Sequence, residues 1–319
     1  MLWKILQGLP LLKASTRAFL KEAEQTPGFR FADWLHGYIY ARWPYLYIGV
    51  GTGEHPATRY LLPLWRMISQ GLPGFRRKKR SIQRVAFADT YHGKVIPLEA
   101  ARRLVTVQRD IRLENLEQII PYQKAKDIVL KNPRHIAVME CPCRSSRTRP
   151  CKPLDVCLII GEPFASFVLE HHPKRARRIT QQEAVAILNR EHRRGHVHHA
   201  FFKDAMLGRF YAICNCCTCC CGAMQAMRHG TPMLASSGYV NKPNGKKCTT
   251  CGACVRACPF GAIRLTNGTV VVDEIRCMGC GVCVTRCKKG VHQLVPDPQK
   301  GKPLEIHHLM QRALDKVMV

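Results

Sequence analysis

The chain has few acidic residues and no long apolar run. Its 319 residues include 22 Asp and Glu against 50 Lys and Arg, so the formal charge is +28. A membrane-spanning helix needs about 18 uninterrupted apolar residues, and the nearest candidate, residues 38–50, contains Arg42 and Pro44. We therefore expect no membrane-spanning helix, and the positive charge favours an anionic partner.

The sequence shows neither a recognisable secretory leader nor a convincing signature of an organic redox cofactor. Lys4 and Lys13 interrupt the only N-terminal apolar stretch, so no signal peptide is recognisable. Eighteen cysteines in a chain without such a leader indicate a reducing compartment, and we expect a cytoplasmic protein. No flavin or nicotinamide motif is convincing, so hydride chemistry is expected to occur elsewhere.

Eight of the cysteines form two copies of one motif near the C-terminus. The first copy reads Cys248-x-x-Cys251-x-x-Cys254-x-x-x-Cys258-Pro259, and the second reads Cys277-x-x-Cys280-x-x-Cys283-x-x-x-Cys287. A tight turn with a cysteine at every third position lets three thiolates bind three irons of a [4Fe–4S] cubane, while the fourth thiolate points away. Zinc sites and disulfides do not need this repeat. The motifs therefore predict two [4Fe–4S] clusters.

Over about residues 239–295 these motifs resemble the bacterial-type two-cluster ferredoxins. In such ferredoxins the fourth cysteine of each run ligates the other cluster. The resemblance thus implies one cluster held by Cys248, Cys251, Cys254 and Cys287, and a second held by Cys277, Cys280, Cys283 and Cys258. One departure is Lys288, which follows the second run where the first run has Pro259.

A second group of ten cysteines lies upstream. Its members are Cys141, Cys143, Cys151, Cys157, Cys214, Cys216, Cys217, Cys219, Cys220 and Cys221. Ten crowded thiols in a cytoplasmic protein indicate a metal or redox centre, and their number and spacing allow one further cubane or two. In an extended run the side chains of Cys219, Cys220 and Cys221 would alternate between two faces, so we expect two centres to share the run or one cysteine to stay free.

The upstream segments resemble parts of larger, mostly uncharacterised ferredoxin-domain iron–sulfur proteins of anaerobes. Those proteins carry a Cys-Pro-Cys-Arg segment, here residues 141–144, and a later Cys-Asn-Cys-Cys segment, here residues 214–217. The resemblance implies additional clusters and names no substrate. Residues 220–222 also resemble the Cys-Cys-Gly signature of the catalytic subunit of heterodisulfide reductases, which carries two such motifs where this chain has one.

Basic residues and histidines surround the upstream cysteines. Arg144, Arg147, Arg149 and Lys152 lie among the first four of them. A positive charge beside an anionic cluster favours its reduced form and raises its potential; the alternative is solvated loop charge. Core or surface roles are expected for His192, His196, His198 and His199 rather than metal ligation.

Periodicity predicts several elements that position these motifs. Strands are expected at residues 136–139, 197–202, 210–213, 262–265 and 270–273, and helices at residues 98–109, 122–131 and 180–190, the last opened by a Thr180 capping box. Residues 2–12 read as an amphipathic helix, and residues 38–47 read as an aromatic strand of a core or interface, with an interfacial membrane belt as the alternative. If the strands before Cys141 and Cys214 are neighbours, the ten upstream cysteines meet at one sheet edge.

We predict an α+β protein in three parts. These are an aromatic, basic N-terminal segment (residues 1–92), a central mixed α/β cysteine-rich domain (93–238) and a dicluster ferredoxin domain with a C-terminal extension (239–319). We expect the protein to pass single electrons through two [4Fe–4S] clusters and one or two upstream clusters. One alternative is an iron–sulfur reductase acting on a disulfide or small acceptor at the upstream cysteines.

The expected partner is an acidic redox protein or a membrane-associated oxidoreductase complex. The apolar stripe at residues 2–12 and the basic run at residues 76–80 favour an anionic lipid surface as well, which would place the protein at the periphery of a membrane. A nucleic-acid-binding protein with structural clusters is a third alternative. The chain lacks a helix-turn-helix or RNA-recognition signature, which argues against nucleic acid.

Overall fold

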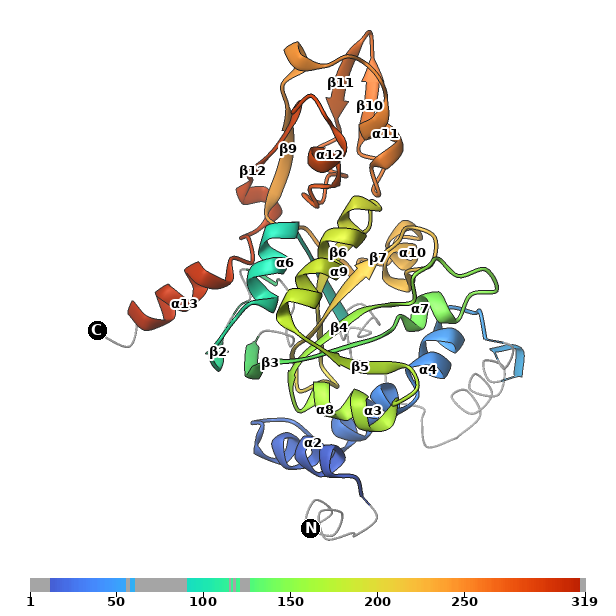
Figure 1. Ribbon diagram of the computed structural model, residues 1–319, viewed down its shortest axis with the longest axis vertical. Coiled ribbons are helices and arrows are strands. Elements are labelled where there is room, and N and C mark those ends of the chain that lie inside the picture. Colours follow the sequence, from blue (N-terminus) through green and yellow to red (C-terminus); the bar gives the residue numbers. More distant parts are fainter. Residues whose placement is uncertain are drawn as a thin grey trace, which may run out of the picture.

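The computed structural model describes residues 12–55, 58–60, 91–114, 116, 119–120 and 127–315. Residues 1–11 and 61–90, which hold most of the predicted amphipathic helix and the basic run at 76–80, lie outside this part of the chain. None of the helices in the described ranges is long and apolar enough to cross a membrane. A large sheet flanked by helices carries a smaller C-terminal module at one end (Figure 1).

An eight-stranded sheet forms the centre of the molecule. Its strands are β1 (Tyr91–Ile96), β2 (Ile111–Leu113), β3 (Ile128–Glu140), β4 (Asp155–Glu162), β5 (Ala176–Ile179), β6 (Val197–Lys203), β7 (Arg209–Cys216) and β8 (Leu234–Ala235). The order is β2-β3-β4-β7-β6-β1-β8, with β5 paired to β3. All pairs are antiparallel except β1 with β8. The strands predicted at 136–139, 197–202 and 210–213 are confirmed within β3, β6 and β7.

The predicted helix at residues 122–131 is wrong over its last four residues. Ile128 begins β3, and it pairs with Leu113 of β2. Ile128 and Leu130 are buried whereas Lys131 is exposed. This period of two belongs to a strand, and pairing with β2 decides the outcome over local helix propensity.

Helices cover both faces of the sheet. One face carries α6 (Leu98–Val105), α9 (Gln181–Arg193) and α13 (Ile306–Asp315), and the other carries α2 (Ala14–Gln25), α3 (Phe31–Arg42), α4 (Pro44–Gly51), α8 (Phe164–His171) and α10 (Gly222–Arg228). Within β3, Val138 packs in the core on the side of α6 and α9, whereas Ala137 and Met139 pack in the core on the side of α3 and α8. The predicted helix at residues 180–190 is confirmed as α9, which Thr180 caps by accepting a 3.1 Å hydrogen bond from the Glu183 N–H. The helix predicted at residues 98–109 is confirmed over residues 98–105 and wrong over residues 106–109, which follow the end of α6.

The aromatic strand predicted at residues 38–47 is wrong, because this stretch forms the end of α3 and the start of α4. Trp34 and Tyr38 stack with ring centroids 5.5 Å apart, as residues one helical turn apart can. Pro44 occupies the first turn of α4, where a missing N–H costs nothing. The aromatic residues therefore serve helix packing against α8 and the sheet.

The C-terminal module combines two strand pairs with two short helices. They are β9 (Tyr239–Pro243) with β12 (His292–Pro296), β10 (Ile263–Thr266) with β11 (Thr269–Val272), α11 (Ala253–Ala257) and α12 (Val282–Arg286), with 3-10 turns at Gly245–Lys247 and Pro298–Lys300. The predicted hairpin is confirmed. Asn267 and Gly268 form its turn with φ of 50° and 71°, the positive values that a tight hairpin turn requires.

The module packs directly on the end of the central sheet (Figure 1). The Ser237 N–H donates to the Met278 carbonyl at 3.1 Å, and the Ser237 hydroxyl donates to the Gly279 carbonyl at 2.9 Å. His192 Nε2 of α9 lies 2.8 Å from Thr285 Oγ1 of α12. Met278 is buried in the same core as the α8 face of the sheet, so the two parts share apolar packing.

Candidate metal centres

The eight cysteines of the C-terminal module fall into two sets. We call Cys248, Cys251, Cys254 and Cys287 the outer set, and Cys258, Cys277, Cys280 and Cys283 the inner set. Burial raises the pKa of Cys254, and the nearby thiols of Cys287 and Cys248 add to this. Burial also raises the pKa of Cys283 to about 12, with Cys258 and Cys277 as neighbours. Each set thus contains the fourth cysteine of the opposite run.

Backbone geometry prepares these loops for anionic ligands. Gly252 and Gly281 precede α11 and α12 with φ of 70° and 79°, which a side chain would strain. The Thr250 N–H points to Cys248 Sγ at 3.4 Å, and the Ala262 N–H points to Cys258 Sγ at 3.2 Å. Such hydrogen bonds stabilise thiolates that bind a cluster.

The two sets differ in exposure. In the outer set Cys251 is exposed and one cysteine, Cys254, is buried, whereas three cysteines of the inner set are buried: Cys277, Cys280 and Cys283. Cys280 also belongs to the core that holds Cys216 and Cys221 of the upstream group. The outer set therefore lies at the surface, and the inner set lies between it and the central sheet.

The strands before Cys141 and Cys214 end at the same sheet edge, although they are not direct neighbours. β4 lies between β3 and β7 and is antiparallel to both, so β3 and β7 run in the same direction. Cys157, near the start of β4, pairs with Cys214 of β7 and with Met139 of β3. The sequence reasoning had not placed this third strand.

Six upstream cysteines form a continuous chain of neighbouring thiols, which we call the six-cysteine group. In order along the chain of contacts they are Cys214, Cys157, Cys141, Cys143, Cys221 and Cys216. The Sγ atoms of Cys221 and Cys216 lie 3.2 Å apart. Contact with the Cys143 thiol, followed by burial, raises the pKa of Cys141 to about 12. Crowded buried thiols that resist ionisation are the donor set that a cationic iron centre would stabilise as thiolates.

The other four upstream cysteines form a compact set, the four-cysteine group. Cys151, Cys217, Cys219 and Cys220 place their Sγ atoms all within 4.8 Å of one another. The run is not extended, because residues 218–220 form a turn. The run is divided between two groups, but the division falls between Cys220 and Cys221 instead of alternating.

Arg144 lies between the two upstream groups and is not solvated loop charge. Its side chain is 1% exposed and donates to Glu191 Oε2 and to the Asn215 carbonyl, each at 2.8 Å. Burial opposes ionisation of Cys217, but the charge of Arg144 and hydrogen bonds from Cys220 and Cys219 together lower the pKa of Cys217. Burial likewise opposes ionisation of Glu191, yet hydrogen bonds from His196 and Arg144 lower its pKa to about 2.

Of the four histidines near the upstream cysteines, His192, His198 and His199 are buried and His196 is half-buried. Burial lowers the pKa of His198 and of His199 to about 3. His198 Nδ1 lies 2.6 Å from Asn215 Oδ1. The rings of His198 and His192 stack 5.3 Å apart between the sheet and α9, whereas His199 packs beside Phe201 on the opposite face.

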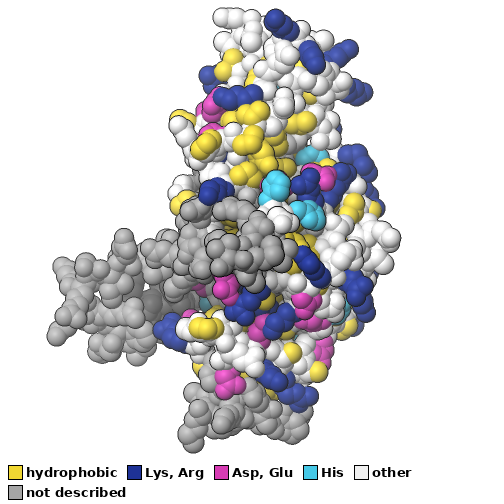
Figure 2. All heavy atoms as spheres, turned by 90° about the vertical axis from the view of Figure 1, so that its left-hand side faces the viewer, with side chains coloured by type: hydrophobic (Ala, Val, Ile, Leu, Met, Phe, Trp, Pro, Cys, Tyr) yellow, Lys and Arg dark blue, Asp and Glu magenta, His cyan; other side chains and the backbone are white. Residues whose placement is uncertain are grey.

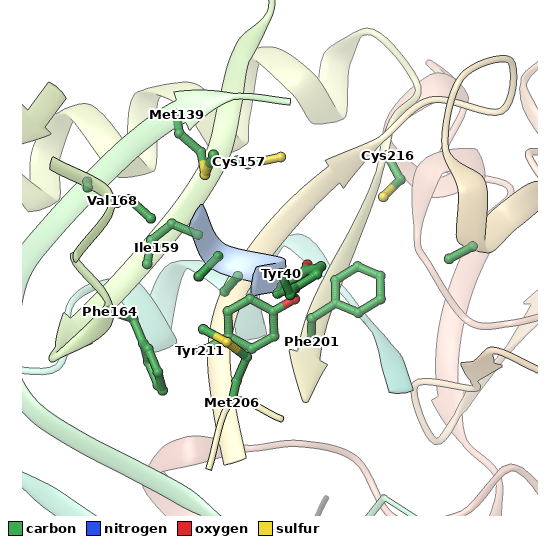
Figure 3. Packing of buried hydrophobic residues seen from close by; sticks show 14 of the residues in the cluster. Tyr40, Met139, Cys157, Ile159, Phe164, Val168, Phe201, Met206, Tyr211 and Cys216 are labelled. Carbon is green, nitrogen blue, oxygen red and sulfur yellow. Dashed lines mark hydrogen bonds between the residues drawn. The ribbon is translucent and has the colours of Figure 1, made fainter. Parts of the chain in front are cut away.

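A large apolar cavity of about 1000 Å³ adjoins the six-cysteine group. Figure 3 shows the rings of Tyr40, Tyr211 and Phe201 close together, with Cys157 and Cys216 above them in this view. All five residues line the cavity. The hydroxyls of Tyr40 and Tyr211 lie 2.9 Å apart. Lys203 also lines the cavity, and burial lowers its pKa to about 8. Sequence reasoning missed this cavity. The one signal in the sequence was Lys203, a charged residue at the end of the fully buried strand β6.

Comparisons with known proteins identify the C-terminal module. Residues 247–291 match the 4Fe-4S dicluster domain. Among curated proteins no match is found. The matched range spans both cysteine runs, and the chain outside it carries the sheet and the ten upstream cysteines. The protein is thus a mixed α/β chain with a ferredoxin-type module that binds [4Fe–4S] clusters.

Proposed function

We propose that this protein is an electron carrier that passes single electrons from the surface of its C-terminal module toward the central sheet. The outer set would hold one [4Fe–4S] cluster, the inner set a second, and the six-cysteine group a third. The observation that carries this proposal is the order of burial. Cys251 is exposed, Cys280 is 8% exposed, and Cys280 shares one core with Cys216.

This order suits a relay. A cluster at the surface can exchange electrons with an outside protein, whereas a buried cluster is shielded from water and from unspecific acceptors. The six-cysteine group has more thiols than one cubane needs, so two of its members remain for hydrogen bonding or exchange. The buried guanidinium of Arg144 beside Cys141 favours the reduced state of that cluster and raises its potential. Electrons would therefore move inward, toward the upstream cluster.

Charge at the outer set supports an acidic redox protein as the partner. Lys246 and Lys247 precede Cys248, and Lys288 and Lys289 follow Cys287, and all four lysines are exposed. Figure 2 shows Lys and Arg side chains around the upper end of the molecule, where the C-terminal module lies. A basic rim around a surface cluster would steer an acidic donor to it. This partner could be a subunit of a membrane-associated oxidoreductase complex.

The relay can be tested by removing its middle member. In the Cys280→Ala variant the inner cluster loses a ligand, so a ferredoxin-sized electron donor should reduce the upstream cluster at least tenfold more slowly than in the native chain. Freeze-quenched EPR of anaerobically purified protein follows the upstream signal. Reduction at the native rate would show that the upstream cluster receives electrons by another route.

The cavity favours a second candidate function, a reductase acting on a small apolar acceptor. Its volume of about 1000 Å³ is at the upper end of cavities that hold organic ligands. Lys203 and the Tyr40–Tyr211 hydroxyl pair place polar groups in an otherwise apolar wall. A ligand there would adjoin the six-cysteine group.

Thiol labelling separates the two candidates. A reductase that uses an exchangeable thiolate would leave one upstream cysteine open to an electrophile in the cluster-loaded protein, and mass spectrometry would locate the label. In a relay, each member of the six-cysteine group either binds iron or stays a protonated thiol, which does not react with the electrophile at neutral pH. Labelling at one of Cys141, Cys143, Cys157, Cys214, Cys216 or Cys221 would therefore favour the reductase.

A further inference from the structure

We infer that the four-cysteine group binds a single tetrahedral metal ion, Zn²⁺, and not an iron–sulfur cubane. This assignment goes beyond electron transfer, because zinc carries no electrons at this site. It divides the ten upstream cysteines into a redox group of six and a structural group of four. Three observations carry it: the spacing of the sulfur atoms, the shape of the turn that presents them, and the positive groups around them.

The spacing of the sulfur atoms fits one ion. Zinc binds thiolates at about 2.3 Å, so the sulfurs of a regular tetrahedron lie roughly 3.8 Å apart. In the four-cysteine group all four Sγ atoms lie within 4.8 Å of one another, with 2.8 Å from Cys151 to Cys219 and 3.7 Å from Cys219 to Cys220. A cubane binds each thiolate to a different iron and therefore needs the sulfurs further apart.

The same structure supplies an internal comparison. Among the described residues, the four-cysteine group is the one set of three or more metal-ligating side chains with this compactness. The outer and inner sets, which have the cubane motif, are not compact in this way. The structure thus distinguishes a closely gathered group of four thiols from the wider arrangement of the ferredoxin cysteines.

Side chains fix the turn that carries three of the four ligands. Three successive carbonyls of this turn each accept a hydrogen bond: Thr218 from Arg228 at 3.0 Å, Cys219 from Gln225 Nε2 at 2.6 Å, and Cys220 from Arg147 at 3.3 Å. Such second contacts orient metal ligands and hold them in place. The fourth ligand, Cys151, comes from the loop after α7 (Pro142–Ser145). The ion would therefore join two segments that are far apart in the sequence.

Charge also favours the complex. Four thiolates around a divalent ion carry a net charge of −2. The guanidinium of Arg144 lies beside Cys217, and those of Arg147 and Arg228 bind the turn. Thiolate ligands without carboxylates or an open position are typical of structural zinc. Tying Cys151 to the turn holds Cys221, the next residue after Cys220, in place within the six-cysteine group.

Elemental analysis of two variants of the full chain tests the assignment. Cys219 is exposed, so Cys219→Ser should disturb the core little and should reduce zinc from about one to nearly zero per chain while iron stays unchanged. The matched variant Cys141→Ser/Cys157→Ser/Cys214→Ser leaves three thiols in the six-cysteine group, fewer than one cubane needs, so it should lose about four irons and keep its zinc. Loss of iron and sulfide from Cys219→Ser, with no zinc in the native chain, would overturn the assignment. One iron in place of zinc would overturn it as well.

A second measurement does not depend on how the variants fold. Zinc X-ray absorption of the native chain should show four sulfur neighbours at about 2.3 Å. Nitrogen or oxygen neighbours, or a zinc content far below one per chain, would contradict a tetrathiolate site. Iron in the clusters does not interfere, because the zinc absorption edge is separate.

Discussion

Cys157 of β4 lies directly opposite Cys214 of β7 in an antiparallel pair. Residues in this relation point to the same face of a sheet, with Cβ atoms about 4.5–5.5 Å apart. The hydrogen bonds of the sheet itself therefore hold two thiols of the six-cysteine group side by side. Sites built on strands keep their geometry better than sites built on loops, so this pair is the rigid part of the proposed upstream cluster.

Iron content tests the upstream cluster directly. We expect about 12 irons per chain, since each of three cubanes contains four. Iron and sulfide analysis of anaerobically reconstituted protein gives the number. A value of eight, belonging entirely to the module at residues 247–291, would remove the six-cysteine group from the relay.

Replacement of Cys258 tests shared ligation in the C-terminal module. Cys258 belongs to the first run but lies with Cys277, Cys280 and Cys283. Cys258→Ala should therefore damage the inner cluster and spare the cluster at Cys254. EPR of the two reduced clusters distinguishes them, and loss of the outer signal alone would contradict the assignment.

Gly279 should be required for docking of the C-terminal module. Its φ is +64°, and a Cβ there would overlap the Ser237 hydroxyl and the Tyr239 carbonyl oxygen. Gly279→Ala should loosen the junction, so the amides of residues 236–241 should exchange hydrogen faster. Gly230→Ala is the matched control, because Gly230 also has positive φ but nothing lies within 4 Å. Equal exchange in both variants would show that the contact does not hold the module.

Removal of Arg144 should destabilise the fold and lower the potential of the upstream cluster. Arg144→Gln removes the buried cation that pairs with Glu191 and leaves this carboxylate with Arg194 and His196, so the cost should lie below the roughly 3–5 kcal/mol of a fully unpaired buried charge. Potentiometric EPR titration should also show a lower midpoint for the upstream signal. Arg149→Gln is the control, since Arg149 is exposed. An unchanged potential in Arg144→Gln would show that the charge of Arg144 does not act on the upstream cluster.

Lys203 should make stability depend on pH in the alkaline range. Burial lowers its pKa from 10.5 to about 8. Between these values the unfolded chain binds more protons than the folded chain, so the contribution of Lys203 to stability rises with pH, by about 3 kcal/mol in total. Lys203→Met should remove this rise in denaturant unfolding between pH 8 and 10.5. The exposed Lys174→Met should retain it, and an identical pH profile in both variants would contradict burial of Lys203.

The spacing of the cysteines was enough to predict the ferredoxin module. The motif works through local geometry: a turn with a cysteine at every third position presents its thiols wherever that turn lies. The same holds for the Asn267-Gly268 hairpin and the Thr180 cap, which short segments specify by themselves. Short runs rich in apolar and aromatic residues likewise predicted the cores of β3, β6 and β7.

Only the tertiary structure decided how the ten upstream cysteines divide. Cys220 and Cys221 are adjacent in the sequence, yet they belong to different groups because the chain turns between them. Cys151 joins the four-cysteine group across 66 residues, counted from Cys151 to Cys217. The aromatic stretch at residues 38–47 is helical because it packs on α8 and the sheet. Contacts between distant segments determine these outcomes, and residue spacing along the chain does not record them.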